Sequence, residues 1–181
     1  MKLFWVLINV VIWTTIFGLS GIFISFFESN KGYALGHCAR WWGKFILFFC
    51  GVDYKVIGLD KLDPKSNYIF AGNHASGFDI PLAFAGLPYW LISIAKIELK
   101  SVLVLGWVMS TAGHIFVDRG KSEKAIASLR DSTLSLIKKP RSVLLFPEGT
   151  RTLNGILGDF KKGGLLLSVE TGISIVPVAF V

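Results

Sequence analysis

Residues 68–79 read Tyr-Ile-Phe-Ala-Gly-Asn-His-Ala-Ser-Gly-Phe-Asp, and the predicted organisation of the whole chain starts from this stretch. Its first four residues are apolar and predict a short strand, which the following Gly-Asn pair ends. Asp79 precedes an Ile-Pro pair and is suited to cap the N-terminus of a helix. On one regular helix, His74 and Asp79 would point about 140° apart. The two side chains therefore meet only if His74 lies in a turn between strand and helix.

That geometry would give His74 a chemical role. A carboxylate that accepts a hydrogen bond from one ring nitrogen leaves the other nitrogen free as a base. The pair is then the base and orienting acid of a catalytic triad that lacks a serine nucleophile, a place that a substrate hydroxyl could take. The alternative is a surface turn in which His74 and Asp79 are only capping groups.

Working outward from this stretch, apolar runs of strand length alternate with helical patterns. The alternation predicts an α/β fold with a mixed, largely central sheet that helices flank on both faces. The expected strands are 53–58, 68–71, 91–95, 113–117, 142–146 and 173–180, and the expected helices are 79–87, 97–110, 121–138 and 160–171.

The N-terminal part of the chain is markedly apolar. Residues 3–27 carry no charged side chain, and as a helix they would run about 38 Å against a hydrocarbon core of about 30 Å. A tilted membrane span is favoured over a helix lying in the interface, and Lys31, Arg40 and Lys44 then place the remainder on the cytoplasmic side. The second run, 37–51, contains paired tryptophans and predicts an interfacial or re-entrant helix, with an ordinary core helix as the alternative.

We therefore expect N-terminal membrane-associated helices over 1–51 and a separate α/β domain over 52–181. The 181-residue chain is 52% hydrophobic with a formal net charge of +7. This combination favours a lipid bilayer or an anionic substrate as partner. Nucleic acid is disfavoured because the chain has no basic arm or recognisable binding module.

No metal site is expected. His74 and Asp79 provide too few ligands, and the other two histidines lie elsewhere in the sequence. Cys38 and Cys50 lie 12 residues apart in apolar surroundings, and we interpret them as small buried hydrophobic side chains. His114 falls inside an expected strand and is interpreted as a structural histidine.

Further polar groups follow other expected strands, and ligands of α/β sheets gather at strand carboxyl ends. Lys96 follows 91–95 and Arg119 follows 113–117; both are candidates for an anionic ligand, with exposed surface charges as the alternative. The stretch 146–151, Phe-Pro-Glu-Gly-Thr-Arg, follows the next strand. Arg151 has the planar fork that suits phosphate, Gly149 lets backbone amides turn toward a ligand, and Glu148 is suited to position Arg151 or a substrate hydroxyl.

Four blocks of the sequence together resemble the glycerophospholipid acyltransferases, most closely the 1-acyl-sn-glycerol-3-phosphate acyltransferases. His74 to Asp79 is similar to the family's H-x4-D motif, and Gly113 to Arg119 to its G-x-I-F-[VI]-x-R pattern. Residues 146–151 match its F-P-E-G-T-R block letter for letter, and 175–178 its V-P-V pattern. The Ala-Lys-x-Glu-Leu sequence at 95–99 also resembles the family.

The resemblance implies roles for these residues. His74 would be the general base and Asp79 its orienting acid, with direct attack of the acceptor hydroxyl on an acyl thioester and no acyl-enzyme. The substrate-binding residues implied by the family's motifs are Lys96, Arg119, Glu148, Gly149, Thr150 and Arg151. The acceptor would be an anionic lysophospholipid, 1-acylglycerol 3-phosphate, whose sn-2 hydroxyl is acylated to give phosphatidate. The donor would be acyl-CoA or acyl-carrier protein, with no further cofactor.

Two departures from the family's pattern stand out. Members usually continue beyond the fourth block, so we expect a domain that is truncated or short at its C-terminus, with the last sheet edge uncovered. Gly77 loosens the first motif. Three alternatives stay open: another acceptor such as glycerol 3-phosphate or another lysophospholipid, hydrolysis of the phospholipase type, and a catalytically silent lipid-binding protein.

Overall fold

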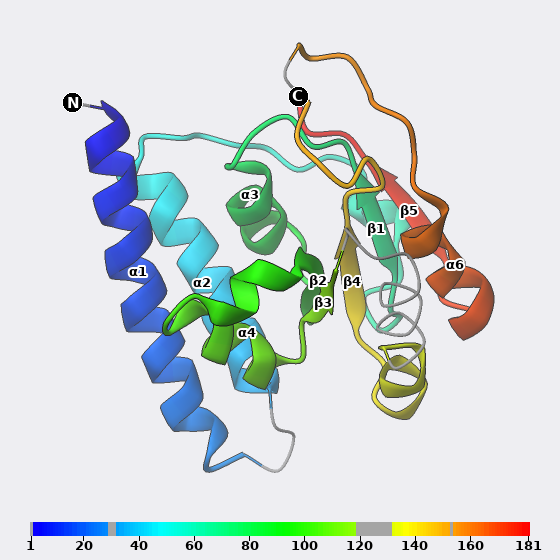
Figure 1. Ribbon diagram of the computed structural model, residues 1–181, viewed down its shortest axis with the longest axis horizontal. Coiled ribbons are helices and arrows are strands. Elements are labelled where there is room, and N and C mark those ends of the chain that lie inside the picture. The colour runs from blue at the N-terminus through cyan, green and yellow to red at the C-terminus, as the bar shows by residue number, and fades with distance from the viewer. Residues whose placement is uncertain (1, 29–31, 119–131, 153) are drawn as a thin grey trace.

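Five parallel strands form the central sheet of the part of the chain that the structure describes (Figure 1). The computed structural model describes residues 2–28, 32–118, 132–152 and 154–181. The strand order is β3-β2-β4-β1-β5. The strands are β1 (Ile69–Gly72), β2 (Leu91–Lys96), β3 (Ile115–Val117), β4 (Ser142–Leu145) and β5 (Ile175–Val178).

Helices cover both faces of this sheet (Figure 1). On one face lie α1 (Lys2–Ser25), α2 (Tyr33–Phe49), α3 (Asp79–Gly86) and α4 (Leu105–Ala112); on the other lie α6 (Lys162–Thr171) and a helical stretch at 132–138. Two short 3₁₀ turns, η1 (Leu59–Lys61) and η2 (Ile97–Ser101), join these elements. The predicted α/β class, with helices on both faces, is confirmed.

Alternation along the strands builds two cores, because successive side chains of a strand point to opposite faces. Ile69, Ile92 and Val143 pack on one face with Leu136 and Leu167 of the covering helices. On the other face, the neighbouring strand positions contribute a second cluster that packs against α3 and α2; its buried members are Phe70, Ala83, Phe84, Leu87, Tyr89, Leu91 and Leu144.

Helix α2 approaches α3 closely because Gly43 has no side chain. A Cβ at this position would lie 2.6 Å from the backbone oxygen of Pro81. Helix α1 packs against α2 through aromatic rings, with Trp13 and Phe45 centroids 4.7 Å apart. The indole N–H of Trp42 also donates to Thr14 Oγ1 at 3.0 Å. The predicted stretch 37–51 is thus a helix that connects α1 to the α/β body.

Within the described residues, one helix, Leu3–Ser25, is long and apolar enough to cross a membrane by length and composition. Most of its side chains that face away from α2 are exposed; Leu3, Phe4 and Phe23 are at least 66% exposed. Exposed apolar side chains continue at the end of the helix with Phe26 and Phe27.

Most of the predicted strands match the structure to within two residues at each end. The predicted strand at 53–58 is wrong: the segment has no strand assignment and pairs with none of the described strands. It runs instead over the end of α3, where Val56 lies so close that a Cβ on Gly86 would be 2.8 Å from it. Its apolar side chains therefore cover a helix and do not join the sheet.

One predicted helix differs from the structure. The helix predicted at 97–110 is divided into η2 and α4, and the chain turns between them at Val104, which has φ 64°. Gly106 permits this turn, because a Cβ there would collide with the backbone oxygen of Lys100. For the predicted helix 121–138, residues 121–131 lie outside the described residues, and 132–138 is helical. The predicted helix 160–171 corresponds to α6.

Candidate active site

His74 and Asp79 meet in the turn between β1 and α3. His74 follows the carboxyl end of β1, and Asp79 is the first residue of α3. Nδ1 of the imidazole lies 2.8 Å from Oδ2 of the carboxylate. The side chain of Asp79 is only 4% exposed and that of His74 15%. The strand–turn–helix geometry expected from the sequence is therefore present.

The carboxylate of Asp79 faces back into the turn. Its Oδ2 accepts backbone N–H bonds from Ala75 and Ser76, both at 2.8 Å. The prediction that Asp79 caps the helix is corrected in this respect: Phe78 occupies the N-cap position without a side-chain cap. Together with Nδ1 of His74, these two amides bring three donors to one oxygen, so the carboxylate is bonded within the turn.

This arrangement fixes the tautomer of a neutral His74. An ionised Asp79 only accepts hydrogen bonds, so Nδ1 carries the proton and Nε2 presents its lone pair. The ring also stacks on Phe146, with centroids 4.0 Å apart and planes inclined by 18°. The imidazole is thus held on one edge by a carboxylate and on one face by an aromatic ring.

The backbone of His74 is hydrogen-bonded to the stretch 146–152, which follows the neighbouring strand β4. Its N–H donates to Oε1 of Glu148 at 2.8 Å, and its carbonyl accepts from the N–H of Thr152 at 2.8 Å. Oε2 of Glu148 accepts from the N–H of Gly158 at 2.9 Å. Glu148 is 5% exposed. Its carboxylate therefore joins β1, β4 and the following loop at the position of the candidate base.

The rest of the stretch 146–151 lies at the same edge. Gly149 has φ 74°, a left-handed conformation that favours glycine, and Thr150 is exposed. Arg151 is exposed, and its Nη1 would lie 3.7 Å from a Cβ on Gly77. The guanidinium group is therefore close to the turn that carries His74.

Lys96 and Arg119 were the other predicted cationic residues. Lys96 ends β2, is 56% exposed in its side chain and forms an ion pair with Glu98 at 2.9 Å. It lies at the carboxyl edge of the sheet, but β4 separates its strand from β1. Arg119 lies outside the described residues.

Sequence reasoning missed two contacts of the site. Asn73, interpreted only as a strand breaker, exchanges two hydrogen bonds with the backbone of Phe180: its Nδ2 donates at 3.0 Å, and its Oδ1 accepts at 2.8 Å. The direct clamp of Glu148 on His74 was also not foreseen. A polar residue directly before the histidine was a signal for the first contact, and no local pattern signals the second.

His114 is a structural histidine, as predicted. Its Nδ1 accepts the backbone N–H of Ser93 at 3.0 Å and lies 2.8 Å from the Ser93 hydroxyl. Burial, helped by the nearby Arg141, lowers the pKa of His114 to about 4. The ring is therefore neutral at physiological pH. It precedes β3, at the edge of the sheet opposite to His74.

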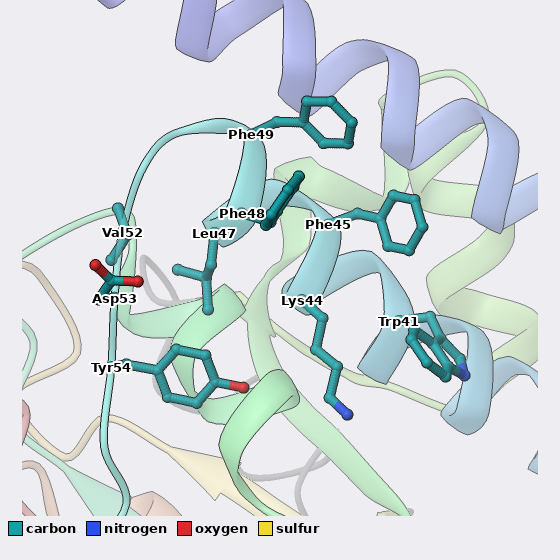
Figure 2. A pocket seen from close by; sticks show the side chains of 9 residues that line it. All are labelled: Trp41, Lys44, Phe45, Leu47, Phe48, Phe49, Val52, Asp53 and Tyr54. Carbon is teal, nitrogen blue, oxygen red and sulfur yellow. The ribbon is translucent and has the colours of Figure 1, made fainter.

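An apolar groove with a volume of about 500 Å³ lies between α2 and the segment that leaves it (Figure 2). Phe45, Leu47 and Phe48 supply apolar wall, while Lys44 and Asp53 bring charge to it. Nζ of Lys44 lies 4.9 Å from the centroid of the Trp41 ring. Among the described residues, no three His, Cys, Asp or Glu side chains are placed to share a metal ion.

The chain is similar to known acyltransferases. A family model described as Acyltransferase matches residues 53–181. The chain is 39% identical over 130 residues to the 1-acyl-sn-glycerol-3-phosphate acyltransferase of Saccharomyces cerevisiae, covering 71% of this chain and 43% of that protein. It is 33% identical over 133 residues to the human 1-acyl-sn-glycerol-3-phosphate acyltransferase alpha, covering 74% and 47%.

A solved structure resembles nearly the whole chain. It is the crystal structure of the 1-acyl-sn-glycerophosphate acyltransferase PlsC from Thermotoga maritima, with a TM-score of 0.77 and 26% sequence identity. The match covers 98% of this chain and 74% of that one. The chain spans about half the length of the relatives that it matches in sequence.

Proposed function

The chain belongs to the Acyltransferase family, and from this premise we propose that it acylates the sn-2 hydroxyl of 1-acylglycerol 3-phosphate from a thioester donor. The product is phosphatidate, and the donor is acyl-CoA or acyl-carrier protein. The observation that carries the proposal is the 2.8 Å contact of His74 Nδ1 with a buried carboxylate, which leaves Nε2 as a base. The names of the proteins above describe acyltransferases for 1-acyl-sn-glycerol 3-phosphate, which supports this acceptor.

In the proposed reaction His74 Nε2 removes the proton of the acceptor hydroxyl as its oxygen attacks the thioester carbonyl. Asp79 stabilises the imidazolium that forms. The tetrahedral intermediate collapses to the new ester and expels the thiolate, which takes the proton back from His74. A positioned base contributes about 10²–10⁴-fold to such a step, so the remainder must come from holding alcohol and thioester together.

Arg151 is proposed to supply part of that alignment by binding the acceptor phosphate. Its guanidinium lies beside the His74–Asp79 turn, and a planar fork of donors suits a phosphate. Lys96 and Arg119 are proposed as further cationic contacts, and Gly149 and Thr150 as the backbone and hydroxyl donors nearest to Arg151. Glu148 is assigned a positioning role, because both of its oxygens accept backbone N–H groups.

We also propose that the protein works at a membrane. One helix has the length and composition of a span, and apolar side chains on α1 and α2 are exposed; they include Phe4, Phe23, Trp41 and Phe48. The groove of Figure 2 opens on α2 and is suited to a lipid tail. The positive charges that follow residues 3–27 support a cytoplasmic position for the α/β domain by the positive-inside rule. The segment 1–51 is then the membrane-associated part and 52–181 the acyltransferase domain.

The test uses the full chain in membranes, 1-acylglycerol 3-phosphate and labelled acyl-CoA or acyl-carrier protein. His74→Ala is expected to abolish phosphatidate formation while the protein stays folded and membrane-bound. Lys65→Gln, a change at an exposed lysine that precedes β1 whereas His74 follows it, serves as the control. Running glycerol 3-phosphate and other lysophospholipids in parallel identifies the acceptor. Full activity of His74→Ala would end the proposal.

A further inference from the structure

A second, smaller cavity lies at the edge of the sheet opposite to His74. Its volume is about 90 Å³, and a buried water needs about 10–15 Å³ of such space, so several waters or one small ion fit. Trp90 directly precedes β2, so the cavity lies at the amino ends of the parallel strands. The lining residues come from the start of α2 and from the loop before β2; they are Tyr33, Gly36, His37, Arg40, Pro88, Tyr89 and Trp90.

Unpartnered hydrogen-bond donors line this cavity. Nε1 of Trp90 is buried and has no partner among the described residues. It would lie 3.2 Å from a Cβ on Gly36, which itself lines the cavity. Arg40 donates only through Nη2, in long bonds to the carbonyls of Leu87 and Tyr89 at 3.3 and 3.4 Å. Its Nε and Nη1 donors have no partner within the described part of the chain.

The surroundings of Trp90 are strongly positive. Nζ of Lys139 lies 4.8 Å from the Trp90 ring centroid, and Cζ of Arg141 lies 5.9 Å from it. Arg141 is only 6% exposed, and its Nε has no partner in the described residues. It forms no ion pair with the carboxylates described. Arg141 is not among the residues that line the cavity, but its charge adds to the positive potential around the Trp90 ring.

The neighbouring carboxylates are engaged elsewhere. Glu28, on the loop before α2, accepts the backbone N–H groups of Gly32 and Ala34. Asp63, whose backbone oxygen accepts from the Tyr89 hydroxyl, binds the N–H of Lys65 and the hydroxyl of Ser66. Neither side chain neutralises Arg40 or Arg141.

We propose that this cavity is an anion site that binds a phosphate group, separate from the candidate active site. Arg40 provides the charged fork, the indole N–H of Trp90 a neutral donor, and exposed His37 a third donor at the mouth. The group is either free phosphate or the phosphate of a lipid headgroup, because both present the same oxygens. A guanidinium with free N–H groups favours phosphate over a spherical anion such as chloride.

The experiment is a calorimetric titration of the detergent-solubilised full chain with inorganic phosphate, at constant ionic strength and against chloride. Arg40→Gln and Trp90→Phe are each compared with Lys65→Gln and with Arg151→Gln. Lys65→Gln removes a nearby exposed charge that does not line the cavity, and Arg151→Gln removes the phosphate contact proposed at the active site. A parallel arm uses lipid nanodiscs with and without phosphatidate and follows hydrogen exchange over 33–40. Thermal melts check that each variant is folded.

We expect Arg40→Gln to weaken phosphate binding about 10- to 100-fold, the range for losing hydrogen bonds to a charged group, and Trp90→Phe to weaken it less. Arg151→Gln and Lys65→Gln should leave this binding intact. Protection of 33–40 only by phosphatidate would identify the lipid headgroup as the source. The proposal is overturned if a folded Arg40→Gln protein binds phosphate and phosphatidate as the parent does, or if Lys65→Gln weakens binding equally.

Discussion

The backbone N–H of His74 donates a hydrogen bond to Oε1 of Glu148 at 2.8 Å, across 74 residues of sequence. The two most distinctive motifs of the chain are therefore one unit, in which the second motif holds the backbone of the first. A change that moves Glu148 is therefore expected to move the backbone of His74.

Replacing Glu148 tests this unit. In Glu148→Gln only one oxygen remains to accept, so either His74 or Gly158 loses its acceptor. We expect the free energy of unfolding to fall by about 1–3 kcal/mol, the cost of an unsatisfied buried donor, and kcat to fall with it. Denaturant unfolding and acyl-transfer assays measure the two effects. Asp159→Asn, at a nearby exposed carboxylate, should change neither; an equal loss there would show that charge, and not the clamp, matters.

Two substitutions of Asp79 distinguish its role in orienting the imidazole from its role in folding the turn. Asp79→Asn can keep its oxygen toward the N–H groups of Ala75 and Ser76 but loses the charge that stabilises the imidazolium. We expect kcat to drop about 10²–10⁴-fold with little change in stability. Asp79→Ala also removes the acceptor and should lower the unfolding free energy by a further ~1–3 kcal/mol. Equal stabilities of the two variants would contradict the role of the carboxylate in the turn.

Arg151 is expected to act on substrate affinity. Arg151→Ala should raise KM for a phosphate-bearing acceptor about 10- to 100-fold, because a hydrogen bond to a charged group is lost, and should leave a phosphate-free acceptor nearly unaffected. Steady-state kinetics with the two acceptors measure the difference. If KM rises equally for both acceptors, Arg151 does not bind the phosphate.

The low pKa of His114 leads us to expect that the stability of the protein depends on pH. Its folded pKa is about 4, below the unfolded value of about 6.5. Between these pH values the unfolded chain binds the proton more tightly, so stability falls as pH decreases from 6.5 to 4. A shift of this size corresponds to about 3 kcal/mol. His114→Asn keeps an acceptor for Ser93 and should flatten this part of the stability curve. An unchanged slope would show that other groups cause it.

Gly43 controls the approach of α2 to α3, the helix that carries Asp79. In Gly43→Ala the new Cβ would meet the backbone of Pro81 and Ala85, which cannot move as a side chain can. We expect a loss of about 1–3 kcal/mol in stability, as for overpacking elsewhere. Gly77→Ala, where a Cβ makes only an ordinary contact with Arg151, is the matched control. Unchanged stability of Gly43→Ala would mean that α2 and α3 can move apart at little cost.

The sequence predicted those features that depend on local patterns. The apolar run before His74 and the five-residue spacing to Asp79 sufficed for the strand, the turn and the pairing of the two side chains. The segment 53–58 has the composition of a strand, but its neighbour in space is Gly86 of α3. Choosing between a sheet edge and a helix surface requires knowledge of tertiary contacts. The same holds for Glu148, whose partners His74 and Gly158 are fixed only once the sheet has formed.

The position of β1 between β4 and β5 determines when the site can exist during synthesis. Tyr68 must bond to Ser142, 74 residues later, and Asn73 to Phe180, 107 residues later. The chain leaves the ribosome at about 5–20 residues per second, so these two partners are synthesised roughly 4–21 s after β1. During that interval the backbone N–H and C=O groups of β1 are unpaired, and the backbone N–H of His74 lacks its acceptor on Glu148. The turn that carries His74 therefore gains its full set of backbone contacts only after Glu148 and Phe180 have been synthesised.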